Sequence, residues 1–375
     1  MTDADLMAHA RDERLKRLLG YLASDPANAA LRSEAAQRAL DCREPAVARA
    51  ILEPAEGALE PADLNRLGLA LIQLGEGGSA TRIFEKLVGE GCAEPAIRFN
   101  LAWSLALEKD YDRALDSLDD SVTAELGQAA MLEVQLLHQK GEFERAAEVA
   151  RHQLAQHPGD KGLAAAVSVL ALDIEDVDLA RACALAAGEH PDALTTLGTL
   201  DLGEQKPAAA LDRFNAALER NPNVPRAWVG RGLAGLLLGD ASNAAGDLDR
   251  GADLFGDHIG SWIAAGWAYL IVGDRAKARA RFERALAIDD NFAESHGSLA
   301  VVDALEGEFE EARRKTAVAL RLDRNCFSGG LAQVLLTTRS GKPKTAQALF
   351  EKMLTTPINA RGDTAAQALA RLGLR

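Results

Sequence analysis

The clearest match to a chemical motif in this sequence is Gly230-Arg-Gly232-Leu-Ala-Gly235, which fits G-x-G-x-x-G letter for letter. In dinucleotide-binding proteins this loop brings backbone N–H groups close to a pyrophosphate, and it lies between a strand and a helix. Here the flanking residues have helical spacing, and Gly232 has the same place in its segment as Gly198 and Gly266 have in theirs. The sequence therefore predicts glycines that allow close helix packing, and no nucleotide cofactor is expected.

Other residues with chemical potential are scattered along the chain. The seven histidines include no H-E-x-x-H spacing, and the closest pair, His152 and His157, does not form a ligand set. Neither a G-x-S-x-G motif nor a P-loop is present. The cysteines form no C-x-x-C pair, which indicates reduced, packed thiols; they are Cys42, Cys92, Cys183 and Cys326. We expect no metal, no catalytic residue and no enzyme activity.

The elements that would position these residues are helices that recur with a fixed period. Residues 259–292 contain a first helical face with small and aromatic side chains, a Gly273-Asp274 turn, and a second face of the same kind. The two faces consist of Trp262, Ala265, Gly266 and Tyr269, and of Ala278, Phe282 and Ala285. Equivalent residues recur about every 34 residues in both directions, as in Gly68 with Phe84 and Gly198 with Phe214.

A helical hairpin with this period resembles the tetratricopeptide repeat (TPR). The resemblance covers nearly the whole chain in about ten units, and it implies an all-α, right-handed superhelical solenoid. The expected division is an N-terminal capping helix in 1–26, four repeats in 27–160, a short irregular repeat in 161–190, five repeats in 191–360 and a C-terminal capping helix in 361–375. The turn of the irregular repeat is acidic and lacks glycine, so we expect the array to bend or flex there.

In proteins of this family, the face of each first helix that does not close the hairpin usually lines a concave groove. The resemblance places apolar residues on this face: Phe99, Trp103, Val169, Leu172, Val229, Leu233, Leu236, Ile263, Trp267 and Leu270. An exposed apolar strip is a usual mark of a binding surface. The alternative is that the array coils tightly enough to bury this face, or that the N-terminal helix fills it.

Two polar binding modes are alternatives to the apolar face. The family's clamp for a C-terminal carboxylate is incomplete here: Asn100 matches one position, but Asn65, Gln128 and Leu132 replace its basic ones. A possible basic docking ridge on consecutive second helices comprises Arg279, Arg281, Arg313 and Lys315. The favoured interpretation of this ridge is a solvated face with internal pairs, Glu311 with Lys315 and Glu310 with Arg314.

Composition narrows the class of protein. A formal net charge of −14 and a pI near 5.1 argue against general nucleic-acid binding. The N-terminal residues do not have the basic and apolar regions of a signal peptide, and no segment has the roughly 20 apolar residues of a membrane span. We therefore expect a cytoplasmic protein, and the Ala- and Arg-rich composition is typical of a bacterial source.

The function expected from this sequence is a non-catalytic scaffold or adaptor that holds an apolar or amphipathic protein segment in its groove. Bacterial TPR scaffolds often serve secretion, polysaccharide export or regulatory assemblies, and self-association is left open. The alternative is a regulatory subunit that sequesters an enzyme or transcription factor. An enzyme with a cryptic site is a more distant alternative.

Overall fold

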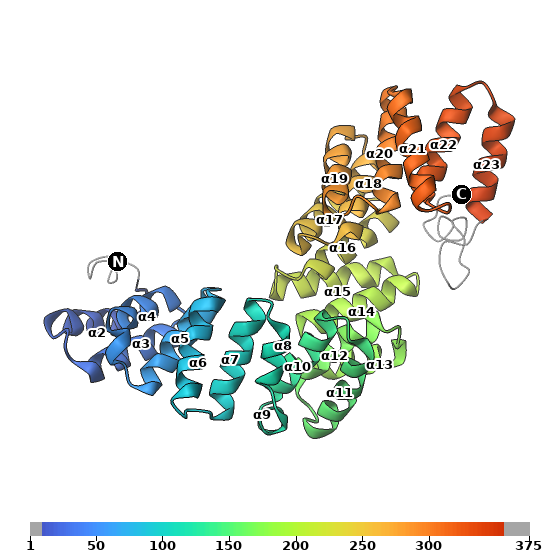
Figure 1. Ribbon diagram of the computed structural model, residues 1–375. Helices are drawn as coiled ribbons and strands as arrows, with labels where there is room; N and C mark the ends of the chain where they lie inside the picture. Colours follow the sequence, from blue (N-terminus) through green and yellow to red (C-terminus); the bar gives the residue numbers. More distant parts are fainter. Residues whose placement is uncertain (1–9, 356–375) are drawn as a thin grey trace. The chain divides into compact units, whose positions relative to one another are not determined.

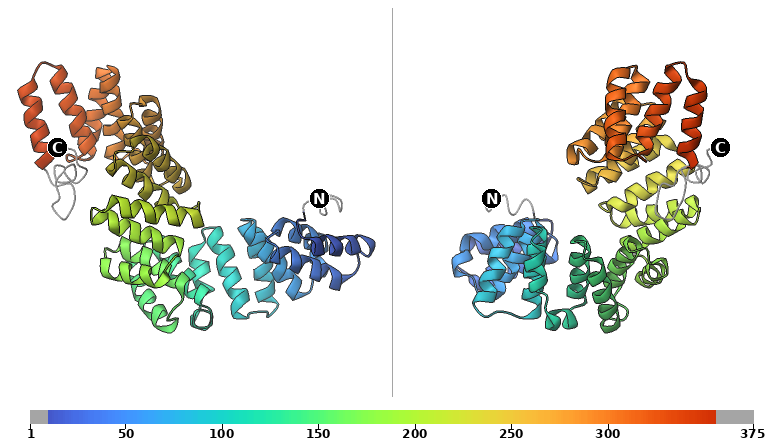
Figure 2. Two further views of the ribbon diagram at one scale, coloured as in Figure 1. Left: turned by 180° about the vertical axis from the view of Figure 1, so that it is seen from behind. Right: turned by 45° about the vertical axis from the view of Figure 1, so that its right-hand side comes forward.

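The computed structural model describes residues 10–355, and this part of the chain consists of helices joined by short turns, without a strand (Figure 1). The chain divides into two compact units, Met1–Ala187 (unit 1) and Gly188–Arg375 (unit 2). Within each unit the helices pair as hairpins, and consecutive hairpins lie side by side in the views of Figures 1 and 2. The predicted all-α fold of helical repeats is confirmed.

Each hairpin has a first and a second helix, and the first helices are α3, α5, α7, α10 and α12 in unit 1 and α14, α16, α18, α20 and α22 in unit 2. The helices of unit 1 are α2 (Glu13–Ser24), α3 (Ala29–Asp41), α4 (Pro45–Leu52), the 3₁₀ helix η1 (Glu53–Ala58), α5 (Pro61–Gln73), α6 (Gly77–Gly89), α7 (Pro95–Leu107), α8 (Tyr111–Asp116), α9 (Asp120–Glu125), α10 (Gly127–Gln139), α11 (Phe143–Gln156), α12 (Lys161–Asp173) and α13 (Val177–Ala187). Those of unit 2 are α14 (Pro191–Gly203), α15 (Pro207–Arg220), α16 (Pro225–Leu237), α17 (Ala241–Phe255), α18 (Ile259–Ile271), α19 (Arg275–Ile288), α20 (Ala293–Glu306), α21 (Phe309–Leu322), α22 (Phe327–Arg339) and α23 (Pro343–Thr355).

Local chemistry explains where these helices begin and end. Pro61 and Pro225 occupy the first position of α5 and α16. A backbone N–H at this position has no partner within the helix, so proline, which lacks this N–H, is tolerated there. Asp160 caps α12 by accepting a hydrogen bond from the N–H of Leu163. The turn between α18 and α19 uses Gly273 with φ +85°, a left-handed conformation that glycine adopts without steric cost.

The hairpins close where an aromatic ring of the second helix lies directly on a glycine of the first. A Cβ placed on Gly266 would lie 2.3 Å from a ring carbon of Phe282, and one on Gly68 would lie 2.4 Å from the ring of Phe84. Both rings are fully buried. Only glycine lets the two helix backbones approach this closely, so these positions fix the spacing within each hairpin.

Glycines also allow consecutive hairpins to approach one another. A Cβ on Gly230 of α16 would lie 2.3 Å from the ring of Phe214 in α15. On α20, a Cβ at Gly297 would lie 2.4 Å from the backbone nitrogen of Gly329 in α22. Each unit is therefore a stack in which small residues set the distances both within hairpins and between them.

The third repeat departs from the expected pattern. Its second helix, α8, ends at Asp116, and a separate short helix, α9, follows. Asp119 starts α9 by accepting hydrogen bonds from the N–H groups of Ser121 and Val122. Hydrogen bonds from Ser121 and Arg98 lower the pKa of Asp119 to about 2, so this carboxylate stays charged. The sequence pattern alone predicted an ordinary second helix here.

The acidic turn of residues 173–178 has an ordinary backbone although it contains no glycine. Glu175 adopts φ +62°, which corresponds to the left-handed glycines of the other turns. A non-glycine residue in this conformation costs about 1–2 kcal/mol. Whether the array bends or flexes in 161–190 stays a prediction.

The predicted closing helix in 361–375 lies outside the described residues, while the N-terminal helix α2 packs against α3.

We predict that Gly266→Leu lowers the free energy of unfolding by about 1–3 kcal/mol or more, because the new side chain would overlap the ring of Phe282. The matched control is Gly246→Leu, since Gly246 is exposed within α17 and a Cβ there meets nothing within 4 Å. Its unfolding free energy should stay constant or rise by up to about 1 kcal/mol, because glycine is a poor helix former. Equal denaturant midpoints for both variants would show that the assigned contact is wrong.

Limited proteolysis should cut the folded chain first between about residues 155 and 192, because the boundary between the two compact units falls there. The fragments can be assigned by mass spectrometry, with denatured chain as the control for intrinsic sequence preference. A first cut inside α16 to α19 would contradict this expectation.

Candidate functional site

The G-x-G-x-x-G motif lies inside α16, and each of its glycines faces a neighbouring side chain. Gly230 lies on the ring of Phe214, a Cβ on Gly232 would lie 2.6 Å from Leu248 Cγ, and one on Gly235 would lie 3.3 Å from Ala244 Cβ. No strand precedes the motif in the described chain. These are packing glycines, as the sequence analysis predicted.

The buried thiols are not nucleophiles at neutral pH. Burial raises the pKa of Cys183 and raises that of Cys326 to about 12. Cys326 Sγ also accepts a hydrogen bond from the N–H of Gly329 at 3.3 Å, which fits a capping role at the start of α22. Across residues 10–355, no group of three or more His, Cys, Asp or Glu side chains is placed to hold a metal ion.

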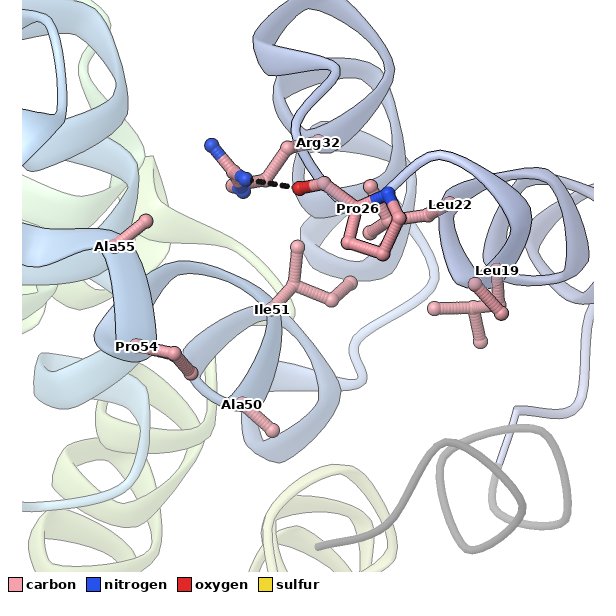
Figure 3. Close-up of a pocket in the computed structure, with 9 residues that line it drawn as sticks. Leu19, Leu22, Pro26, Arg32, Ala50, Ile51, Pro54 and Ala55 are labelled. Carbon is pink, nitrogen blue, oxygen red and sulfur yellow. Dashed lines mark hydrogen bonds between the residues drawn. The ribbon is translucent and has the colours of Figure 1, made fainter.

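A small hollow lies beside the first hairpin (Figure 3). It has a volume of about 230 Å³ and is lined mostly by apolar side chains, among them Leu19, Leu22 and Ile51. Its one guanidinium, that of Arg32, donates a hydrogen bond to the backbone carbonyl of Pro26 at 2.5 Å. Because no other charged side chain lines it, the hollow has no recognisable catalytic arrangement.

The ten predicted groove residues share one property: none of them is buried. Leu233 is 39% exposed, and the other nine are partly exposed. The residues that close the same hairpins differ clearly, since Trp262 is 6% exposed and Ala265 is fully buried. Each first helix concerned therefore has one buried apolar stripe and a second stripe that its own hairpin does not cover completely.

In unit 1 the most prominent part of this second stripe is an aromatic pair on α7. The rings of Phe99 and Trp103 meet edge to face, with centroids 5.7 Å apart. Both pack partly against the buried cluster that includes Leu105 and Leu132. The indole N–H of Trp103 makes no hydrogen bond to the described part of the chain, so it is available as a donor. Val169 and Leu172 lie on α12, two hairpins further along.

In unit 2 the stripe continues across several hairpins. Trp267 and Leu270 of α18 pack against Ala300 and Val301 of α20 and Ala332 of α22, together with Leu331 and Leu335. We call Ile263, Trp267, Leu270, Leu331 and Leu335 the α18–α22 strip. Leu331 and Leu335 are not among the predicted groove residues, although they have the same places on α22 as Ile263 and Trp267 have on α18. Applying the groove positions to every repeat would have found them.

Trp267 is held from two sides. Its indole N–H donates a hydrogen bond to Ser298 Oγ at 3.1 Å, and its ring meets that of Phe282 with centroids 5.9 Å apart. Trp267 therefore also contacts the second helix of its own hairpin, since Phe282 belongs to α19. The side chain is nevertheless partly exposed and has a fixed orientation.

The cations of the predicted basic ridge are paired with carboxylates. Arg279 binds Asp303 at 2.7 Å and Glu306 at 2.6 Å, and Lys315 binds the same Asp303 at 2.5 Å. Arg281 donates two hydrogen bonds to the carboxylate of Asp249, and hydrogen bonding to this carboxylate raises the pKa of Arg281. Arg313 pairs with Glu310.

The pairs expected within α21 have different partners in the structure. Arg314 pairs with Glu311, and Lys315 reaches Asp303 on α20 instead of Glu311. Asp303 is 2% exposed, so the ridge cations of α19 and α21 meet at a buried carboxylate between hairpins. This arrangement leaves little unpaired positive charge on the ridge.

The incomplete carboxylate clamp is also occupied internally. Asn100 Nδ2 donates a hydrogen bond to Asn65 Oδ1 at 3.1 Å, and Leu132 is buried.

Within residues 10–355, no helix is both long enough and apolar enough to cross a membrane.

Comparison with known proteins gives a family but no close relative. Models described as tetratricopeptide repeat match residues 65–130, 195–258 and 259–292. No curated protein matches the chain. Solved structures that resemble it include a crystal structure of MamA, with 18% identity over 42% of this chain and 92% of that chain and a TM-score of 0.36. MamA 41-end from Desulfovibrio magneticus RS-1 has 20% identity over 44% of this chain and 92% of that chain, with a TM-score of 0.37.

The matched repeats lie on the hairpins α5 to α9, α14 to α17, and α18 with α19. The same helical hairpin continues through the described residues on either side of these matches. The chain is a tetratricopeptide repeat protein, a member of a family whose helical surfaces bind protein partners.

Proposed function

We propose that this chain is a non-catalytic scaffold that holds apolar or amphipathic segments of partner proteins on the free faces of its first helices. The observation that supports this most strongly is helix α18, which contains no charged residue. One of its stripes is buried in the hairpin through Trp262 and Tyr269, while Ile263, Trp267 and Leu270 on the other stripe are partly exposed. Exposed apolar strips of this kind mark interaction surfaces.

The shape of the strip favours a protein segment over a small molecule. It extends from α18 to α22 through apolar side chains that pack on one another. Partner segments bind such surfaces through a few aromatic or aliphatic anchors spaced along one helix or extended chain. On the family resemblance alone, we propose that the scaffold serves a bacterial secretion, polysaccharide-export or regulatory assembly.

Trp267→Ala should weaken retention of the native partner by roughly 2 kcal/mol or more, as expected for an aromatic anchor at the centre of an interface. Its unfolding free energy should fall by less than the roughly 3–5 kcal/mol typical of a core tryptophan. Binding can be measured with the partner purified from the native host, and stability by denaturant unfolding. A variant that is strongly destabilised but binds normally when folded would place Trp267 in the core and contradict the proposal.

A matched pair of leucines separates binding from folding. Leu233 lies on the groove face of α16 and is 39% exposed. Leu238 is the residue directly after the same helix, lies outside the groove face and is 48% exposed. Because both are exposed, Leu233→Ser and Leu238→Ser should leave stability within about 0.5 kcal/mol of the parent. Only Leu233→Ser should reduce partner retention. Equal loss in both variants, or no loss in either, would argue against the groove face as the binding surface.

A further inference from the structure

The two units differ strongly in charge. Residues 1–187 contain 32 acidic and 19 basic residues, a formal charge of −13, whereas residues 188–375 contain 24 and 23, a charge of −1. Nearly all of the negative charge of the chain therefore belongs to unit 1. A field of this kind attracts segments of opposite charge and repels acidic ones.

Part of this charge is concentrated in the loops that join one hairpin to the next in unit 1. Residues 53–60, 89–94 and 116–126 contain no Lys, Arg or His. Six carboxylates in these loops are exposed and take part in no ion pair that the structure shows, and we call them the acidic edge: Glu60, Glu90, Glu94, Asp116, Asp120 and Glu125.

The acidic edge lies beside the aromatic pair of α7. Loops that join consecutive hairpins share one edge of the stack, and Figure 1 shows α9 and the α6–α7 connection along the same side of unit 1. Phe99 follows Glu94 by five residues, which corresponds to about 7 Å along the axis of α7. Arg98 pairs with Asp119 at the start of α9, so the helix that contains Asp120 and Glu125 is tied to α7.

We propose that the face of unit 1 around Phe99 and Trp103 binds a basic amphipathic protein segment. The apolar side of the segment packs on the two rings, its Lys or Arg side chains point to the acidic edge, and the free indole N–H of Trp103 donates to it. This inference rests on the proposed function and adds a partner class to it. Charge complementarity selects this occupant: a second copy of the acidic unit 1 would be repelled.

The loops around the α18–α22 strip of unit 2 are less acidic. Helix α18 has no charged residue, and in two of the three loops that join the hairpins from α17 to α22, Asp257 and Asp323 are accompanied by His258 and Arg324. The two units therefore bind segments of different chemistry. Unit 1 selects a basic amphipathic segment, and unit 2 selects an apolar segment with little charge preference.

The test uses the full-length chain and three fluorescent peptides of about 18 residues, roughly 27 Å long when helical. Two have the same leucine face, with a polar face of Lys in one and of Glu in the other. The third is a shuffled Lys peptide with the same composition and no apolar face. Fluorescence anisotropy gives Kd at about 50 and about 300 mM salt, between which the screening length falls markedly.

We expect the amphipathic Lys peptide to bind at least about tenfold more tightly than the other two, and its affinity to fall at high salt. Trp103→Ala should weaken this binding by about tenfold or more, while Leu238→Ser, which lies outside the groove faces, should leave it unchanged. The combined substitution Asp116→Asn, Asp120→Asn and Glu125→Gln replaces only exposed carboxylates. It should weaken binding of the Lys peptide and reduce the salt dependence while the chain stays folded.

Three results would overturn the inference, and they differ in what they say of the proposed function. Equal binding of the shuffled and amphipathic Lys peptides, with no effect of Trp103→Ala, would mean only a general attraction of cations. Equal binding of the Lys and Glu peptides, lost in Trp103→Ala, would remove the basic selectivity but leave the scaffold function standing. Binding of the Lys peptide that depends on Trp267 instead of Trp103 would place the basic segment on unit 2.

Discussion

The contact between a glycine of a first helix and an aromatic ring of a second helix is the constraint on which the rest of the structure depends. At Gly266 and Phe282 the ring occupies the space that a Cβ would need, and Gly68 with Phe84 repeats the arrangement in unit 1. Because the ring is fully buried, it contributes both apolar area and a fixed interhelical distance. Gly230 extends the same contact to the preceding hairpin, so one type of packing sets the spacing in both directions.

This mode of closure determines which surface is left for function. The hairpin buries one stripe of each first helix, and a repeat by itself has nothing to cover the other stripe. Charged side chains do not cover it either, because cations such as Arg279 and Lys315 are directed to the buried Asp303 between hairpins. What remains on the first helices is apolar and partly exposed, and in unit 1 it is bordered by carboxylates. These properties favour the capture of protein segments.

The sequence predicts the features that depend on local spacing. Helix starts at Pro61 and Pro225 and the pairing of Gly266 with Phe282 follow from positions that repeat every 34 residues or so. Features that depend on tertiary proximity are not predictable in this way. Lys315 reaches Asp303 because α20 lies beside it, and no pattern within α21 indicates that. Helix α8 ends early because Asp119 caps a new helix, α9, and the chain does not continue the first one. The positive φ of Glu175 shows that a turn can keep its form without glycine. Leu331 and Leu335 were within reach of the repeat pattern and were missed because the groove positions were not followed into the last repeat.

The central claim, that the second stripes are open and receive partner segments, is tested most directly at the four tryptophans of the chain. Labelling with 5-fluorotryptophan gives each indole its own ¹⁹F resonance, and a soluble paramagnetic agent broadens the resonances of those that water reaches. In the free chain the account predicts broadening of Trp103 and Trp267 but little of Trp262, which is 6% exposed. Adding a partner that spans both units should protect Trp103 and Trp267, while Trp228, which is partly exposed and bonded to the carbonyl of Pro222, should remain accessible. Protection of Trp103 and Trp267 already in the free chain, or continued broadening of both in the complex, would contradict the account.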